Sequence, residues 1–207
     1  MCGISGFINF DKKKINKRIL EKFGKILNHR GPDNTGLYYN DFVGLCHNRL
    51  SILDLSDNGN QPMTDGRYYL VYNGEIYNYL ILKKDLDDLS ITFSSSSDTE
   101  VLFLHLIHFG IDNTLKKIQG MFAFAFYDSK KDDLFLARDR FGIKPLFYTI
   151  KDRTLFFASE MKALTKQIPF ELDQFRALYS VLGIVDKSKH ETIFKGLFHI
   201  PPGSYLS

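Results

Sequence analysis

Met1-Cys2-Gly3-Ile4 opens the chain and places a cysteine directly behind the initiator methionine. Removal of Met1 makes Cys2 the first residue, so that one residue carries both a thiol and a free α-amine. An unperturbed thiol titrates near ~8.5 and an α-amine near ~7.7–8.0, so the thiol is nucleophilic near neutral pH and the amine can relay its proton. Such a nucleophile needs no histidine partner. The alternative is a small apolar cysteine that packs at the start of a strand.

The composition indicates one large globular domain. The chain has 207 residues, of which 44% are apolar and 25% charged, and a net charge of +3 is too small to indicate nucleic-acid binding. Cys2 and Cys46 form no disulfide framework, which fits a reducing compartment. Residues 1–10 lack the basic segment of a signal peptide, and no stretch approaches the ~20 apolar residues of a membrane span. We expect a cytoplasmic protein that binds neither nucleic acid nor membrane.

Strands joined by short turns dominate both halves of the chain, and helices fall between them in two groups. Short turns favour antiparallel pairing, and the sequence contains no internal repeat or domain linker. The pattern predicts an α+β fold with two sheets, helices outside them, and a single domain over residues 1–207. Strands are expected at 2–10, 35–39, 43–53, 68–72, 121–127, 134–138, 146–150 and 154–158, and residues 200–206 are expected to form a turn into a short strand. Helices are expected at 15–27, 77–86, 98–110, 161–165 and 172–182.

Five polar or glycine positions could bind an amide that is also an amino acid. Attack on an amide builds an oxyanion, for which the Asn73 side chain and the Gly74 backbone N–H are candidate donors. Arg49 could pair with a carboxylate through two hydrogen bonds, and Asp98, helped by Glu75, could bind an ammonium. Each position also has a structural interpretation. Asn-Gly is typical of a hairpin turn, Arg49 could form a surface ion pair, and Asp98 could favour a helix start through the dipole.

Taken together, these residues resemble the glutaminase domain of asparagine synthetase and related class II glutamine amidotransferases, which are N-terminal nucleophile hydrolases. The resemblance covers residues 1–206. The matching blocks are Cys2-Gly3-Ile4-Ser5-Gly6, His29-Arg30-Gly31-Pro32-Asp33, Asn48-Arg49-Leu50-Ser51-Ile52, Tyr72-Asn73-Gly74-Glu75-Ile76-Tyr77-Asn78, Ser97-Asp98-Thr99-Glu100-Val101, Gly120-Met121-Phe122-Ala123-Phe124, residues 137–146, residues 158–164 and Pro201-Pro202-Gly203.

The resemblance implies a four-layer αββα sandwich of two antiparallel sheets, the N-terminal nucleophile hydrolase fold. It implies that Met1 is removed and that Cys2 forms a γ-glutamyl thioester with L-glutamine, releasing ammonia. Asn73 and Gly74 match the family's oxyanion hole. The implied substrate-binding residues are Arg49 with the backbone of Ile52 and Leu53 at the carboxylate, and Glu75 and Asp98 near the α-ammonium.

The resemblance also implies partners. The domain itself is expected to need no cofactor and no metal. ATP and Mg²⁺ are expected in a synthetase domain, whose Ser-Gly-Gly-x-Asp-Ser pyrophosphate loop has no match in this chain. That domain would lie in the parent protein or in a separate subunit, and a homodimer is a further expected partner. The implied ammonia acceptor is aspartate, for asparagine synthesis. A sugar carboxylate of a surface polysaccharide, and a non-catalytic glutamine-binding or docking role, are the alternatives.

Three features depart from the family pattern, and the missing pyrophosphate loop is one of them. Ser96 stands where the family usually has glycine just before Ser97-Asp98, so its side chain could restrict the loop that places Asp98. A retained Met1 would bury the α-amine in a peptide bond and remove the base.

Overall fold

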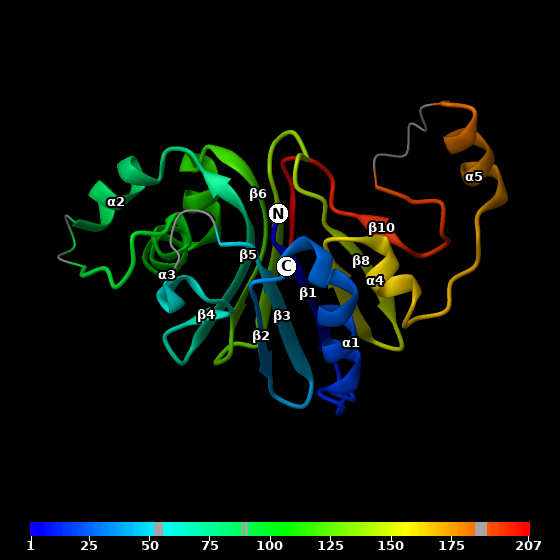
Figure 1. The fold of residues 1–207 in the computed structure, drawn as a ribbon, viewed down its shortest axis with the longest axis horizontal. Coiled ribbons are helices and arrows are strands. Elements are labelled where there is room, and N and C mark those ends of the chain that lie inside the picture. The colour runs from blue at the N-terminus through cyan, green and yellow to red at the C-terminus, as the bar shows by residue number, and fades with distance from the viewer. Residues whose placement is uncertain (52–55, 88, 90, 185–189) are drawn as a thin grey trace.

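Two antiparallel sheets pack face to face, with helices on both outer faces (Figure 1). This is a computed structural model that describes residues 1–51, 56–87, 89, 91–184 and 190–207. Hairpin turns such as that between Asp128 and Asp133 join neighbouring strands, as the sequence predicts. Within the described ranges, no helix is both long and apolar enough to cross a membrane.

The first sheet has six strands, and β1 lies near its middle. All seven residues of β1 are buried, because β3 and β9 pair with its two edges and apolar clusters cover its two faces. The strand order is β10 (Phe198–His199), β8 (Phe147–Lys151), β9 (Thr154–Ala158), β1 (Gly3–Asn9), β3 (Val43–Arg49) and β2 (Asn34–Tyr39).

The second sheet has five strands, with β6 and β5 at its centre. They pair residue for residue over nine positions, from Tyr68 opposite Asp128 to Ile76 opposite Gly120. The order is β11 (Tyr205–Leu206), β7 (Asp133–Arg138), β6 (Gly120–Asp128), β5 (Tyr68–Ile76) and β4 (Met63–Thr64).

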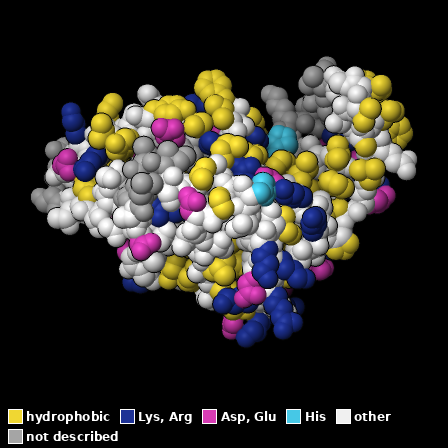
Figure 2. Space-filling model, viewed as in Figure 1, with side chains coloured by type: hydrophobic (Ala, Val, Ile, Leu, Met, Phe, Trp, Pro, Cys, Tyr) yellow, Lys and Arg dark blue, Asp and Glu magenta, His cyan; other side chains and the backbone are white. Residues whose placement is uncertain are grey.

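Helices cover both sheets, and one further helix stands apart. Figure 1 shows the helix pairs on opposite sides of the sandwich, and Figure 2 shows hydrophobic side chains gathered over α5. No residue of α5 is buried. The helices are α1 (Arg18–Leu27), α2 (Tyr79–Asp87), α3 (Asp98–Lys117), α4 (Met161–Thr165) and α5 (Gln174–Val181), with short 3₁₀ turns η1 (Asn28–Arg30) and η2 (Asp57–Gly59).

Three apolar clusters separate four layers. One lies between the sheets and contains Ile4, Val71 and Phe157. A second joins the five-stranded sheet to α2 and α3, and a third joins the six-stranded sheet to α1 and α4. Because each cluster fills the space between adjacent layers, the order is helices, sheet, sheet, helices. The expected αββα sandwich is confirmed.

The expected end of a strand at Asn73-Gly74 is wrong. β5 continues to Ile76, because Gly74 pairs with Phe122 and stays in the ladder. A side chain at Gly74 would put its Cβ 2.4 Å from the carbonyl oxygen of Met121, so only glycine fits there. Tertiary pairing therefore overrides the local turn signal.

Gly110, expected at a helix end, is non-helical with a φ of 75°, and it marks a kink after which a second helical part of α3 continues to Lys117. Thr114 holds the two parts together by donating to the carbonyl oxygen of Gly110 at 2.7 Å. Two other boundaries differ from expectation. α1 begins at Arg18 rather than at residue 15, and the strand expected over 43–53 ends at Arg49 as β3.

We predict that Phe157→Ala lowers the free energy of unfolding by about 3–5 kcal/mol, the usual cost of removing a buried ring. Phe157 is 0% exposed and pairs with Gly6. A Cβ added at Gly6 would lie 2.6 Å from the Phe157 ring. Urea denaturation followed by circular dichroism measures the change. Phe175→Ala is the matched control, because Phe175 on α5 is 75% exposed. Equal losses in the two variants would contradict the assignment of the core.

Candidate active site

Cys2 lies at the start of β1, at one end of the layer between the sheets. Side chains alternate along a strand, and Ile4 packs between the sheets, so Cys2 is directed to the same face. Its Sγ is 3.4 Å from the backbone nitrogen of Leu50 and 3.6 Å from the Leu50 carbonyl oxygen. The half-buried sulfur is therefore held against the end of β3.

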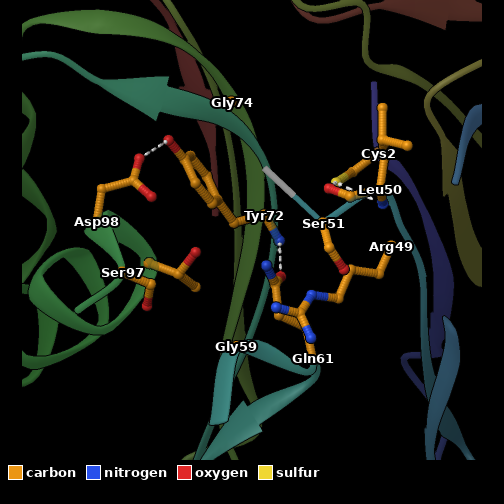
Figure 3. A pocket seen from close by; sticks show the side chains of 11 residues that line it. Cys2, Arg49, Leu50, Ser51, Gly59, Gln61, Tyr72, Gly74, Ser97 and Asp98 are labelled. Carbon is orange, nitrogen blue, oxygen red and sulfur yellow. Dashed lines mark hydrogen bonds between the residues drawn. The ribbon is translucent and has the colours of Figure 1, made fainter. Parts of the chain in front are cut away.

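A cleft that is open to solvent contains this sulfur. Figure 3 shows Cys2, Leu50 and Arg49 on one side of it, with Ser97 and Asp98 on the other. The lining residues are Cys2, Arg49, Leu50, Ser51, Gly59, Gln61, Tyr72, Gly74, Ser97, Asp98 and Thr99.

Arg49 lines the cleft from the end of β3 and is buried. Its Nη1 donates to the carbonyl oxygen of Ser56 at 2.7 Å and to Oδ1 of Asn60 at 2.8 Å. These bonds to the segment around η2 fix the guanidinium. The alternative of an exposed surface ion pair is wrong, because this side chain is an internal group.

Asp98 is the first residue of α3 and is also buried. Its Oδ2 accepts hydrogen bonds from the Tyr72 hydroxyl and the Ile76 backbone N–H, both at 2.8 Å. Burial raises the pKa of Asp98 above its ordinary value, and these hydrogen bonds oppose the rise in part. The carboxylate is thus fixed in a partly desolvated position beside the cleft.

The loop before α3 is held by a buried carboxylate. The Ser97 side chain accepts from the Glu100 backbone N–H at 3.3 Å, as a helix N-cap does. The Glu100 side chain does not return to Ser97 but accepts from the backbone N–H groups of Ser94 and Ser95 at 2.8 and 2.6 Å. Ser96 is exposed and its φ is not positive, so serine fits this loop without displacing Asp98.

Asn73 and Gly74 occupy adjacent positions in β5. Gly74 lines the cleft, whereas Asn73 does not. Asn73 is 1% exposed, and its Nδ2 has no hydrogen-bond partner among the described residues. Because Val71 faces the layer between the sheets, Asn73 is directed to that face, as Cys2 is. A buried amide donor therefore remains available close to the cleft.

Not every residue expected at the site lies in the cleft. Glu75 is exposed and is not among the lining residues. Ile52 and Leu53 lie outside the residues that the structure describes.

Sequence reasoning missed three residues at or beside the site. Gln61 lines the cleft, and its Oε1 accepts from the backbone N–H of Tyr72 at 2.6 Å. Tyr72 lines the cleft too, and strand alternation from Gly74 could have identified it. Lys144 is buried. Its pKa is lowered mainly by burial and secondly by the charge of Arg30, and the charges of Cys2 and Glu75 oppose this change. No spacing in the sequence indicates Lys144.

Metal-binding side chains do not cluster in the described part of the chain. Among those residues, no group of three or more His, Cys, Asp or Glu side chains could hold a metal ion.

Comparison with known proteins gives a match over the whole chain. The model of the family described as "Glutamine amidotransferase domain" matches residues 1–207. Asparagine synthetase [glutamine-hydrolyzing] 1 of Bacillus subtilis is 36% identical over 100% of this chain and 33% of its own length. Amidase chry2 of Gibberella zeae is 37% identical over 100% of this chain and 32% of its own length. The chain therefore spans about a third of the length of these relatives.

Solved structures agree in fold. The glutamine phosphoribosylpyrophosphate amidotransferase of B. subtilis, complexed with ADP and GMP, superposes with a TM-score of 0.70 at 20% identity. The match covers 99% of this chain and 46% of that chain, and at this identity it bears on the fold alone. With the family model matching from the first residue to the last, the chain belongs to the glutamine amidotransferase domain family.

Proposed function

We propose that this domain hydrolyses L-glutamine to L-glutamate and ammonia through a γ-glutamyl thioester on Cys2. The observation that supports this most strongly is that Cys2, Arg49 and Asp98 line one cleft. A thiol, a guanidinium and a carboxylate in one cleft match the amide, carboxylate and ammonium of a single small substrate. The whole of residues 1–207 would serve as one domain in this activity.

In this proposal, Arg49 and Asp98 bind the two charged ends of the amino acid. Arg49 would donate charge-assisted hydrogen bonds to the α-carboxylate, and its bonds to Ser56 and Asn60 keep it oriented before substrate arrives. Asp98 would bind the α-ammonium, with the charge of Glu75 adding to the attraction. The backbone of Ile52 and Leu53 would complete the carboxylate end.

The reaction then proceeds in two halves on Cys2, after Met1 has been removed. The free α-amine takes the thiol proton, and the sulfur attacks the side-chain carbonyl carbon of glutamine. The Nδ2 of Asn73 and the N–H of Gly74 would stabilise the oxyanion. The carbon–nitrogen bond breaks as the amine returns its proton to the leaving nitrogen, giving ammonia and a thioester. Water, deprotonated by the same amine, attacks the thioester, and glutamate leaves as the thiol regains a proton.

The ammonia would be used by an ATP-dependent synthetase part, in the same polypeptide or in a separate subunit. The full-chain similarity to a glutamine-hydrolysing asparagine synthetase supports aspartate as acceptor. A sugar carboxylate remains the alternative acceptor. A purely glutamine-binding role is less well supported, because it gives no use to the buried Nδ2 of Asn73, for which the described part of the chain offers no hydrogen-bond partner.

We predict that Cys2→Ala lowers the rate of glutamate release from glutamine at least about a thousandfold, as loss of a nucleophile usually does. Cys46→Ala is the matched control. Burial raises the pKa of the Cys46 thiol to about 12, which keeps it protonated and unreactive. Mass spectrometry should also find Cys2 as the first residue of the active protein. Full activity of Cys2→Ala would exclude the proposed mechanism.

We predict that Asp98→Asn raises the KM for glutamine about ten- to a hundredfold, because a charge-assisted hydrogen bond is worth about 1.5–3 kcal/mol. Since the pKa of Asp98 lies above 3.8, its charge is lost at a higher pH than that of an exposed aspartate. The KM of the wild type should therefore rise as pH falls towards this pKa, whereas the KM of Asp98→Asn should stay high and flat. Asp133→Asn, at an exposed position, is the control. Equal pH dependence in all three proteins would argue against the ammonium contact.

We predict that Arg49→Lys lowers, about tenfold, the ratio of kcat/KM for L-glutamine to kcat/KM for a simple amide such as propionamide. Lysine keeps the charge but cannot supply two parallel donors to a carboxylate. Competition assays with both amides measure this ratio. Arg67→Lys is the control, because the guanidinium of Arg67 pairs with Asp128 outside the cleft. An unchanged ratio in Arg49→Lys would remove Arg49 from substrate recognition.

A further inference from the structure

We propose that Glu160 is a positioning residue for Cys2 and that it acts through the guanidinium of Arg30. The inference rests on the proposed glutaminase function. Neither residue lines the cleft. Their role is argued from contacts that connect α4 and η1 to the backbone of the nucleophile.

Arg30 contacts the nucleophile directly. It closes η1, and its Nε donates to the carbonyl oxygen of Cys2 at 2.9 Å. The Arg30 side chain is buried, with a relative exposure of 8%.

Glu160 fixes the orientation of this guanidinium. Its Oε1 accepts from Nη1 of Arg30 at 2.9 Å and lies 2.9 Å from Nε2 of His29, and its Oε2 is 3.0 Å from Nζ of Lys162. Nη2 of Arg30 has no partner among the described residues. The carboxylate and the Cys2 carbonyl are therefore the two acceptors that set the plane of the guanidinium.

The Glu160 carboxylate stays charged at any working pH. Burial raises its pKa, but hydrogen bonds from Arg30, Lys162 and His29 outweigh that effect and hold the pKa at about 2. The ion pair with Arg30 is therefore present above the ordinary carboxyl pKa and is lost only as pH falls through about 2. Only a mutation can remove it under assay conditions.

The backbone that carries Glu160 is itself attached to β1. The N–H of Ser159 donates to the carbonyl oxygen of Ile4 at 2.8 Å, and the Ile4 N–H donates to Oγ of Ser159 at 2.9 Å. Ser159 is fully buried. The junction between β9 and α4 thus holds Ile4 directly and Cys2 through Arg30.

A chain end needs such an attachment because it tends to fray. After removal of Met1, Cys2 is joined to the chain by one peptide bond only. Its sulfur contacts the Leu50 backbone, and its carbonyl contacts Arg30. Loss of the carbonyl contact would let the sulfur move while leaving the cleft residues Arg49 and Asp98 in place. The effect should therefore fall on kcat and not on KM.

The test compares Glu160→Gln with the wild type in steady-state glutaminase assays on the mature protein. We expect kcat to fall about tenfold, as small misplacements of a reacting group do, and KM to stay within about twofold. Glu160→Asp should restore part of kcat. Glu171→Gln is the control, because Glu171 forms an exposed ion pair with Lys195 away from β1, and it should leave both constants unchanged.

A double-mutant cycle with Arg30→Lys separates positioning from general destabilisation. If Glu160 acts through Arg30, the double variant should be no slower than the slower single variant, whereas independent effects would multiply. Multiplying effects, an unchanged kcat in Glu160→Gln, or a rise confined to KM would each overturn the inference. If Glu160→Gln does not fold, the same cycle run with Glu160→Asp gives the decision. Failure of the proposed function is distinguishable, because the wild type itself would then release no more glutamate than Cys2→Ala.

Discussion

The complete burial of β1 is the constraint on which the molecule depends. A strand with every residue buried must have both edges paired and both faces covered, because unpaired backbone groups cannot be left without partners in the interior. β3 and β9 satisfy the edges, and the clusters on either side cover the faces. Since Cys2 immediately precedes β1, the forces that bury this strand also bring the Cys2 thiol to the rim of the sandwich.

The same constraint explains the small residues near the N-terminus. A Cβ at Gly6 would lie 2.3 Å from the carbonyl oxygen of Gly44 and 2.6 Å from the ring of Phe157. The ring can therefore cross β1 only at a glycine. Two sheets can then approach closely enough for residues of β1, β3 and β5 to meet at one end. The strand ends supply Arg49, Tyr72 and Gly74 to the cleft, and residues of the connecting segments, such as Ser51, Gln61 and Ser97, complete its lining.

Much of this arrangement could be predicted from the sequence, and the failures share one cause. The hairpins and the apolar helices were identified because their signals are local and repeat at a regular period. Asn73-Gly74 also carries a strong local signal, for a turn, but pairing with β6 overrides it. At the site, Cys2, Arg49 and Asp98 could be selected by motif and by chemistry. Gln61 and Lys144 could not, because their places depend on contacts between residues far apart in sequence.

The two cysteines differ sharply in their surroundings. Cys46 is fully buried under α1, and a Cβ added at Gly24 would lie 3.1 Å from the Cys46 sulfur. Cys2, in contrast, is open to solvent through the cleft. An electrophilic dye added to the native protein should therefore label a single position, and unfolding should double the label taken up per molecule. The stoichiometry of labelling then becomes a direct count of the folded fraction in any preparation.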